Sequence, residues 1–244
     1  MPAEIPTIVA TSIGIPLRPR LALDRRGTAI FRLAVELAQP RSTPRLCFLA
    51  TATGDATESL VRVYVGLGEL DVRLSHLSLF PMPNVEDVRE HLLRQDVIWV
   101  GGGSVVNLLA VWRAHGLDGI LRECWEAGVV LGGVSAGSLC WHVGGTTDSF
   151  GLKLQPVTNA LGWLPYANGV HYDSEAQRRP LLEQLVASGE LPTAYATDDG
   201  VGLVYRGTQL AEAVAQEEGK SAYLVERADD ATARETVIAP RLLS

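Results

Sequence analysis

Five short apolar runs constrain the fold of this chain more than any other feature of its sequence. Each is about the length of a strand, and four of them end in Gly, Ser or Thr. They are TIVAT around Ile8, RLCFLAT around Phe48, VRLSHLSL around Leu74, DVIWVGGG around Ile98 and GVVLGGVS around Leu131. Continuous apolar runs of this length are typical of parallel strands that are buried on both faces of a sheet. The sequence therefore predicts an α/β fold.

The segments between these runs carry the apolar periodicity of helices. From Gly27 to Ala38, apolar residues recur every three or four positions. The segments from Val105 to Arg113 and from Leu117 to Ala127 follow the same rule, each after a glycine-containing turn. Short strands that alternate with such helices indicate a doubly wound, mostly parallel sheet flanked by helices. In such a sheet, ligands bind at the carboxyl ends of the strands.

Beyond Gly144 the pattern is weaker. Residues 144–170 hold glycines, prolines and aromatic residues with little periodicity, and a helix is expected from Asp173 to Ser188. The expected strands here are TAYATDD and GVGLVYRG, followed by QLAEAVA and SAYLVER as a small antiparallel edge near the carboxyl terminus. No repeat or linker interrupts the chain, so we expect a single α/β domain over residues 1–244.

Charge and cysteine content exclude several classes of function. The net charge is −7 and no block of Lys or Arg occurs, so nucleic acid is not an expected partner. Three cysteines without a CxxC spacing predict neither a disulfide framework nor a zinc site. The chain has neither a secretory leader pattern nor a membrane-spanning apolar run, which predicts a cytoplasmic protein without membrane contact.

The residues Gly133 to Gly137 read G-x-S-x-G, with Ser135 at the centre. This pattern indicates a sharp strand-to-helix turn that projects the serine hydroxyl above the edge of the sheet. The N–H of Ala136 would then lie at a helix amino terminus, where it can stabilise an oxyanion. The pentapeptide alone leaves a second interpretation open, in which Ser135 only caps the helix.

A serine nucleophile needs a base, which is most often a histidine held by a carboxylate. Of the five histidines, His171 is the candidate, because it follows a short apolar segment and precedes a helix. Asp198 and Asp199 lie in a predicted turn between two strands, and either can hold the imidazole. The other histidines are interpreted as structural or solvated: His76, His91, His115 and His142.

Four blocks of sequence carry a resemblance to a known family. They are VIWVGGGSVVNLLAVWRAHGLD, GVVLGGVSAGSLCW, GVHYDSEAQRRP and AYATDDGVGLVY. Together they resemble the peptidase E family of serine peptidases, which includes cyanophycinases and whose fold is similar to that of class I glutamine amidotransferases. The resemblance implies Ser135 as nucleophile and His171 as general base and acid. It also implies an oxyanion hole formed by Ala136 with Gly102 or Gly103.

The sequence departs from the family pattern in two places. Ser104 follows the glycine turn where Asn is common, and it is the candidate for a polar contact to substrate. Asp199 stands where the family's aspartyl dipeptidase has a glutamate before a glycine, so its shorter side chain requires a closer backbone; Asp198 stays an alternative. The resemblance also implies an arginine that binds a substrate carboxylate. Arg178 and Arg179 are the candidates, unless they pair with Glu175 or Glu183.

The sequence therefore predicts a serine peptidase that hydrolyses short peptides, as a dipeptidase or aminopeptidase with a preference for amino-terminal Asp. The mechanism needs no metal or cofactor, and the protein is expected to be a monomer or homodimer. Two alternatives remain open at this point. One is an amidohydrolase or cyanophycinase-like hydrolase on the same scaffold, and the other is a non-catalytic protein that binds a small ligand.

Overall fold

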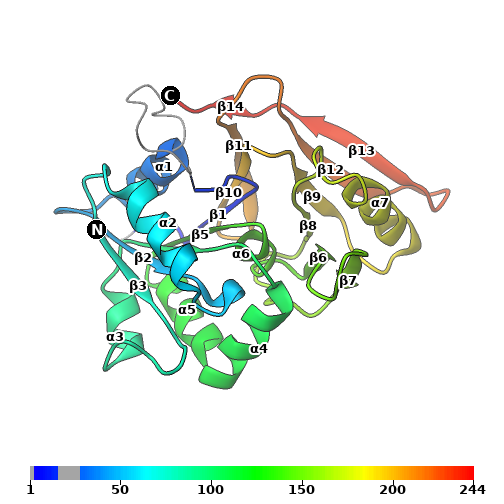
Figure 1. Ribbon diagram of the computed structural model, residues 1–244. Coiled ribbons are helices and arrows are strands. Elements are labelled where there is room, and N and C mark those ends of the chain that lie inside the picture. Colours follow the sequence, from blue (N-terminus) through cyan, green and yellow to red (C-terminus); the bar gives the residue numbers. More distant parts are fainter. Residues whose placement is uncertain (1–2, 16–27) are drawn as a thin grey trace.

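The computed structural model describes residues 3–15 and 28–244, and two sheets dominate it (Figure 1). Within these residues, the larger sheet has eight strands in the order β14-β11-β10-β1-β5-β4-β2-β3. Five neighbouring strands run parallel to one another: β1, β5, β4, β2 and β3. Strand β10 is antiparallel to both β1 and β11. The bounds are β1 (Thr7–Thr11), β2 (Arg45–Leu49), β3 (Arg73–Leu77), β4 (Val97–Val100), β5 (Val130–Val134), β10 (Val201–Arg206), β11 (Gln209–Ala215) and β14 (Arg241–Leu242). The predicted mostly parallel sheet is confirmed.

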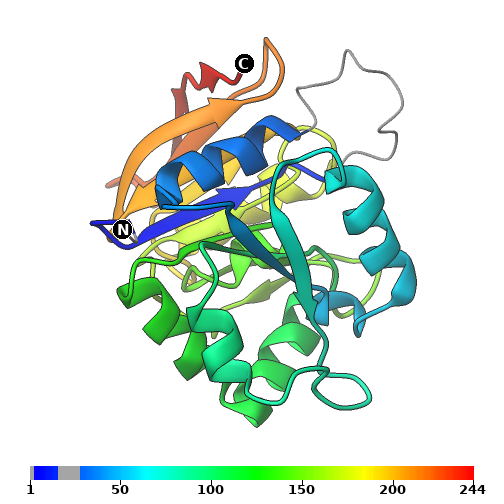
Figure 2. The ribbon, with the colours of Figure 1, turned by 90° about the vertical axis from the view of Figure 1, so that its left-hand side faces the viewer.

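Four of the five parallel strands, β1, β2, β4 and β5, are almost wholly buried, as their apolar runs predict, whereas the edge strand β3 is partly exposed. Neighbouring residues of β4 belong to different cores: Ile98 packs with one set of helices and Trp99 with the other. Figure 2 shows helix α1 on one side of these strands and helices α4 and α5 on the other. The helices are α1 (Ala29–Ala38), α2 (Thr57–Leu67), α3 (Val88–Leu93), α4 (Val105–His115), α5 (Leu117–Glu126), α6 (Ala136–Leu139) and α7 (Arg178–Ser188), with a 3-10 turn at Thr51–Thr53.

A second sheet packs beside the first, and the sequence patterns do not predict it. Its strand order in the described chain is β13-β12-β9-β8-β6-β7. The strands are β6 (Gly144–Thr147), β7 (Gln155–Val157), β8 (Ala167–Gly169), β9 (Ala194–Thr197), β12 (Ala222–Arg227) and β13 (Ala233–Ile238). Helix α7 packs against this sheet (Figure 1). Three of the six strands have only three or four residues and contain glycine, proline or asparagine, which carry little strand signal.

Two expectations for the carboxyl-terminal half need correction. The two strands expected to form one small antiparallel edge separate: QLAEAVA is β11 of the first sheet, and SAYLVER holds β12, which pairs with β9 and β13 in the second. The helix expected from Asp173 begins instead at Arg178. The intervening residues turn back on themselves, since the N–H of Glu175 donates to the carbonyl of His171 and the N–H of Arg178 to that of Glu175.

Candidate active site

Ser135 occupies a strained turn between β5 and α6. Its backbone has φ 57° and ψ −113°, a conformation that is rare for a residue other than glycine. Its N–H donates to the carbonyl of Thr11 at 3.0 Å, and its own carbonyl accepts from the first turn of α6. The hydroxyl forms no capping bond to the helix. The interpretation of Ser135 as a simple helix cap is therefore wrong, and the strained serine turn agrees with the G-x-S-x-G pattern.

A glycine is required where this turn passes β4. A Cβ on Gly137 would overlap the carbonyl oxygen of Val100, which belongs to the backbone of the neighbouring strand. The overlapping atom is main chain, so a rotamer change cannot relieve it. The small residues of the motif thus let α6 begin directly against the central strands.

The glycine turn after β4 lies beside the serine. A Cβ added to Gly102 would stand 3.2 Å from Cβ and 3.8 Å from Oγ of Ser135. Gly103 has φ +134°, which an L side chain rarely adopts. In residues 3–15 and 28–244, the N–H groups of Gly102, Gly103 and Ala136 donate to no protein acceptor. These donors are thus free to bind an oxyanion at this edge of the sheet.

Ser104 has a structural partner. Its hydroxyl accepts the N–H of Asn107 at 3.2 Å and so caps the amino terminus of α4. Its own N–H donates to the carbonyl of Ala52 at 2.9 Å. A contact between this hydroxyl and substrate would compete with the cap, and the substrate role of Ser104 stays a prediction.

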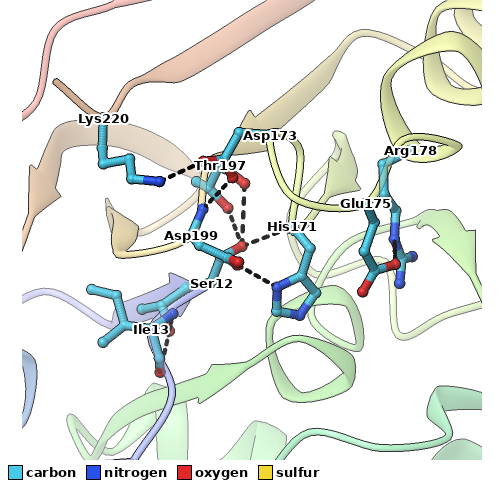
Figure 3. A network of polar contacts seen from close by, with 10 residues as sticks. Ser12, Ile13, His171, Asp173, Glu175, Arg178, Thr197, Asp199 and Lys220 are labelled. Atoms are coloured by element: carbon cyan, nitrogen blue, oxygen red, sulfur yellow. Dashed lines mark hydrogen bonds and ion pairs between the residues drawn. The ribbon is translucent and has the colours of Figure 1, made fainter.

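His171 and Asp199 are in direct contact. Nδ1 of the imidazole lies 2.5 Å from Oδ1 of Asp199, and 22% of the His171 side chain is exposed (Figure 3). His171 follows β8 and Asp199 lies in the turn between β9 and β10. A carboxylate at Nδ1 keeps the proton on that nitrogen, which leaves Nε2 of the neutral ring free to accept one.

Asp198 has partners other than the imidazole. Its Oδ2 accepts the N–H of Ser221 at 3.0 Å and the hydroxyl of Tyr223 at 3.2 Å. Burial raises the pKa of its carboxyl. Of the two neighbouring aspartates, Asp199 is therefore the one that contacts His171, despite its short side chain.

The end of β1 brings the serine and the histidine to one place. The N–H of Ser135 binds the carbonyl of Thr11, and the N–H of His171 donates to Oγ of the next residue, Ser12, at 3.1 Å. In the described part of the chain, the Ser135 hydroxyl itself has no hydrogen-bond partner, so no hydrogen bond joins the serine and histidine side chains. Such bonds are often long in free enzymes and tighten with substrate.

Comparison with known proteins identifies the family. The model of "Peptidase family S51" matches residues 28–213, which is most of the chain. The chain belongs to peptidase family S51. It is 44% identical over 191 residues to the uncharacterized peptidase YgaJ of Bacillus subtilis, covering 78% of this chain and 81% of that protein. It is 29% identical over 195 residues to peptidase E of Shewanella denitrificans, covering 72% and 78% of the two chains.

Two solved structures share the fold of this S51 peptidase. A peptidase from an acI-B1 actinobacterium has a TM-score of 0.63 at 15% identity, covering 96% of this chain and 95% of its own. A protein of Listeria monocytogenes EGD-e, described as a putative peptidase E, has a TM-score of 0.59 at 17% identity, covering 84% and 96%. The family makes this chain a serine-type peptidase, and the resemblance found in its sequence is confirmed.

Both candidate substrate arginines of the S51 peptidase have protein partners. Arg178 is 3% exposed, and its guanidinium binds Glu175 at 2.7 Å (Figure 3). It also donates to the carbonyl of Thr146 at 2.5 Å. Arg179 binds Glu235 at 2.7 Å and lies against the rings of Tyr172 and Tyr223. The pairing of Arg178 with Glu175, which the sequence left open, is thus observed. A substrate role for either guanidinium stays a prediction, and each would first have to release these partners.

A cleft opens beside the glycine turn, and the sequence patterns do not reveal it. Its volume is about 450 Å³, and its described lining includes Phe48, Gly102, Val134 and, on α2, Glu58 and Arg62. It adjoins the turn that holds Ser135, at the carboxyl ends of the parallel strands. A larger groove of about 770 Å³ lies instead at the amino ends of β2 and β3, beside Arg45 and Arg73, and contains none of the candidate residues.

Among the residues described, no group of three His, Cys, Asp or Glu side chains is arranged to hold a metal ion. Cys47, Cys124 and Cys140 are buried free thiols. No helix in the described ranges is both long and apolar enough to cross a bilayer.

His142 is buried in the core beside helix α6 and is not available as a base. Its ring contacts the carbonyl of Ser138 at 3.0 Å and the hydroxyl of Tyr205 at 3.3 Å. Burial lowers the pKa of this imidazole from 6.5 to about 4. The side chain is therefore neutral in the folded protein at physiological pH.

This buried histidine makes the fold sensitive to mild acid. Below about pH 6.5 the unfolded chain takes up a proton at His142 that the folded protein refuses until about pH 4, so stability falls as the pH decreases through this window. We expect His142 to remove about 1.4 kcal/mol of unfolding free energy between about pH 7.5 and about pH 5.5. Urea unfolding at both pH values measures this loss.

His142→Gln and His115→Gln provide the comparison. The first removes the buried imidazole and should reduce the pH dependence by that amount, even if it lowers stability at both pH values. The second changes an exposed histidine at the end of α4 and should preserve the dependence. If the unfolding free energy changed equally with pH in the wild type and in both variants, His142 would not be the group responsible.

Proposed function

We propose that this S51 peptidase hydrolyses short peptides in the cytoplasm, with Ser135 as nucleophile, His171 as general base and acid, and Asp199 as the carboxylate that holds the imidazole. The contact between Nδ1 of His171 and Oδ1 of Asp199 carries this proposal, together with the strained turn of Ser135 and the bonds that tie both segments to the end of β1. The family supports it at the level of a peptidase.

The reaction follows from the positions of these groups. Ser135 Oγ attacks the scissile carbonyl while Nε2 of His171 takes its proton, and Asp199 stabilises the imidazolium that forms. The negative charge that develops on the carbonyl oxygen faces the N–H groups of Ala136 and Gly102 or Gly103. The imidazolium then protonates the leaving amine, and water hydrolyses the acyl-enzyme by the same steps in reverse order.

The choice of substrate follows from the cleft rather than from the two arginines. The cleft beside Gly102 combines an apolar floor, formed in part by Phe48 and Val134, with the charged side chains of Glu58 and Arg62. Its volume of about 450 Å³ lies in the range of sites that bind small molecules. Peptides of a few residues are therefore the expected substrates, and a preference for amino-terminal Asp would use Arg62 or a released Arg178 or Arg179.

A substrate panel combined with a covalent probe tests the proposed function. X-Leu dipeptides and aminoacyl anilides are incubated with the protein, and a fluorophosphonate is used in parallel, because it labels only an activated serine. We expect cleavage of at least one panel member and a single label on the peptide that contains Ser135. Labelling without peptide cleavage would favour an amidohydrolase or polymer hydrolase, and neither labelling nor cleavage would favour a binding protein.

A further inference from the structure

A second carboxylate stands behind the His171–Asp199 pair. Asp173 follows His171 by two residues, and its Oδ1 accepts the backbone N–H of Asp199 at 2.8 Å (Figure 3). Asp173 belongs to the loop of the histidine, whereas Asp199 belongs to the turn after β9. This hydrogen bond therefore ties the turn of the carboxylate to the loop of the imidazole.

Lys220 completes this arrangement from a third segment. Its Nζ lies 2.5 Å from Oδ2 of Asp173, and both side chains are 28% exposed. The next residue, Ser221, donates its N–H to Asp198. The loop before β12 thus contacts two acidic residues. One is Asp173, which binds the N–H of Asp199, and the other is Asp198, which precedes Asp199 in the sequence. Lys220 is one of only two lysines in the chain, the other being Lys153.

The pair is charged at neutral pH. Burial alone would raise the pKa of the Asp173 carboxyl, but Lys220 and the N–H of Asp199 outweigh it and hold this pKa below its ordinary value. The hydrogen bond to Asp173 in turn raises the pKa of Lys220. An anionic Asp173 is a stronger acceptor for the Asp199 N–H than a neutral one, and Lys220 offsets the repulsion among three neighbouring carboxylates.

The turn that carries Asp199 needs such support. Oδ1 of Asp199 must stay within hydrogen-bond distance of Nδ1 while the imidazole gains and loses a proton, and small displacements of catalytic groups cost large factors in rate. On the other side, Ser12 fixes the backbone of His171 through its hydroxyl, which also binds Oγ1 of Thr197 at 2.7 Å. Among the described residues, Asp173 is the one that binds the backbone N–H of Asp199.

We propose that Asp173 and Lys220 are positioning residues, whose ion pair holds the backbone of Asp199 so that its carboxylate stays on Nδ1 of His171. This inference rests on the proposed function of Ser135, His171 and Asp199. The pair contacts neither the substrate nor the reacting atoms, and it acts through Asp199 alone.

Kinetics of three variants test this role. Lys220→Met and Asp173→Ala should each lower kcat about tenfold with little change in KM, because the loss falls on the transition state rather than on substrate binding. Lys220→Arg keeps the charge and should restore most of kcat. Lys153→Met makes the same substitution at the exposed loop lysine, which forms no ion pair among the described residues, and should match the wild type. Titration with the fluorophosphonate counts the active molecules, so partial unfolding does not lower the kcat per active site.

A double-mutant cycle separates positioning from general damage. If Asp173 acts through Asp199, adding Asp173→Ala to Asp199→Ala should change kcat by less than about twofold. A full tenfold further loss, or wild-type kcat in both Lys220→Met and Asp173→Ala, would overturn the inference. Should Asp173→Ala not fold, Lys220→Met and its cycle with Asp199→Ala decide the question. Failure of the proposed function would be seen separately, as unaltered peptidase activity in Ser135→Ala.

Discussion

Replacement of Ser135 by alanine is expected to lower kcat/KM for the preferred peptide by about 10³-fold or more. The hydroxyl is the proposed nucleophile, and its removal leaves His171 and Asp199 without the group that they are proposed to activate. Binding and the oxyanion donors remain, so a small residual rate above that of water is expected. The folded structure should persist, because the hydroxyl has no hydrogen-bond partner in the described chain.

Initial rates with the best panel substrate and fluorophosphonate labelling measure this loss. Ser188→Ala, which removes the hydroxyl of an exposed serine at the end of α7, is the matched control and should keep the wild-type rate. The proposed mechanism would fail if Ser135→Ala retained wild-type kcat/KM, and the strained conformation of Ser135 would then need another explanation.

Replacement of Gly137 by alanine is expected to destabilise the protein by about 3 kcal/mol or more. The added methyl group would overlap the carbonyl oxygen of Val100, and main-chain atoms on both sides must move to accept it. These atoms belong to β4 and to the start of α6, so the displacement spreads into the central sheet and into the turn of Ser135. Activity should fall together with stability.

Urea unfolding of Gly137→Ala beside Gly119→Ala measures the effect. Gly119 lies in α5 with open space around the position of its missing side chain. Alanine there should leave stability unchanged or raise it by up to about 1 kcal/mol, because alanine favours the helix. If both variants had the same urea midpoint, the turn of Ser135 would accept the added methyl group without loss of stability, contrary to its close packing against Val100.

The first sheet could be predicted because its signals are local. The central parallel strands are apolar runs, and the residues on their two faces meet separate cores, as Ile98 and Trp99 do. The second sheet could not be predicted, because β8, with the sequence Ala-Asn-Gly, has neither alternation nor β-branched residues. Its pairing depends on neighbours far along the chain, and local patterns do not report such contacts.

The candidate site likewise combines features that local sequence predicts with features that depend on distant contacts. The turn of Ser135 could be predicted, since a G-x-S-x-G pattern after an apolar run encodes its backbone locally. The choice between Asp198 and Asp199 could not, because both residues suit a turn and only the contacts with Ser221 and His171 distinguish them. Ser12 had a usable signal, as a hydroxyl directly after a parallel strand, whereas Lys220 had none before the fold brought it to Asp173.

The two bonds made by the end of β1 have a consequence for how this protein can diverge. Thr11 holds the main chain of Ser135, and Ser12 holds that of His171, so one dipeptide at the end of a central strand links residues that follow strands of two different sheets. Loops and strands of the second sheet can lengthen, shorten or change sequence without breaking that link, provided that this dipeptide and its two bonds persist. New specificities can therefore arise at the periphery while the segments of the reacting groups stay linked.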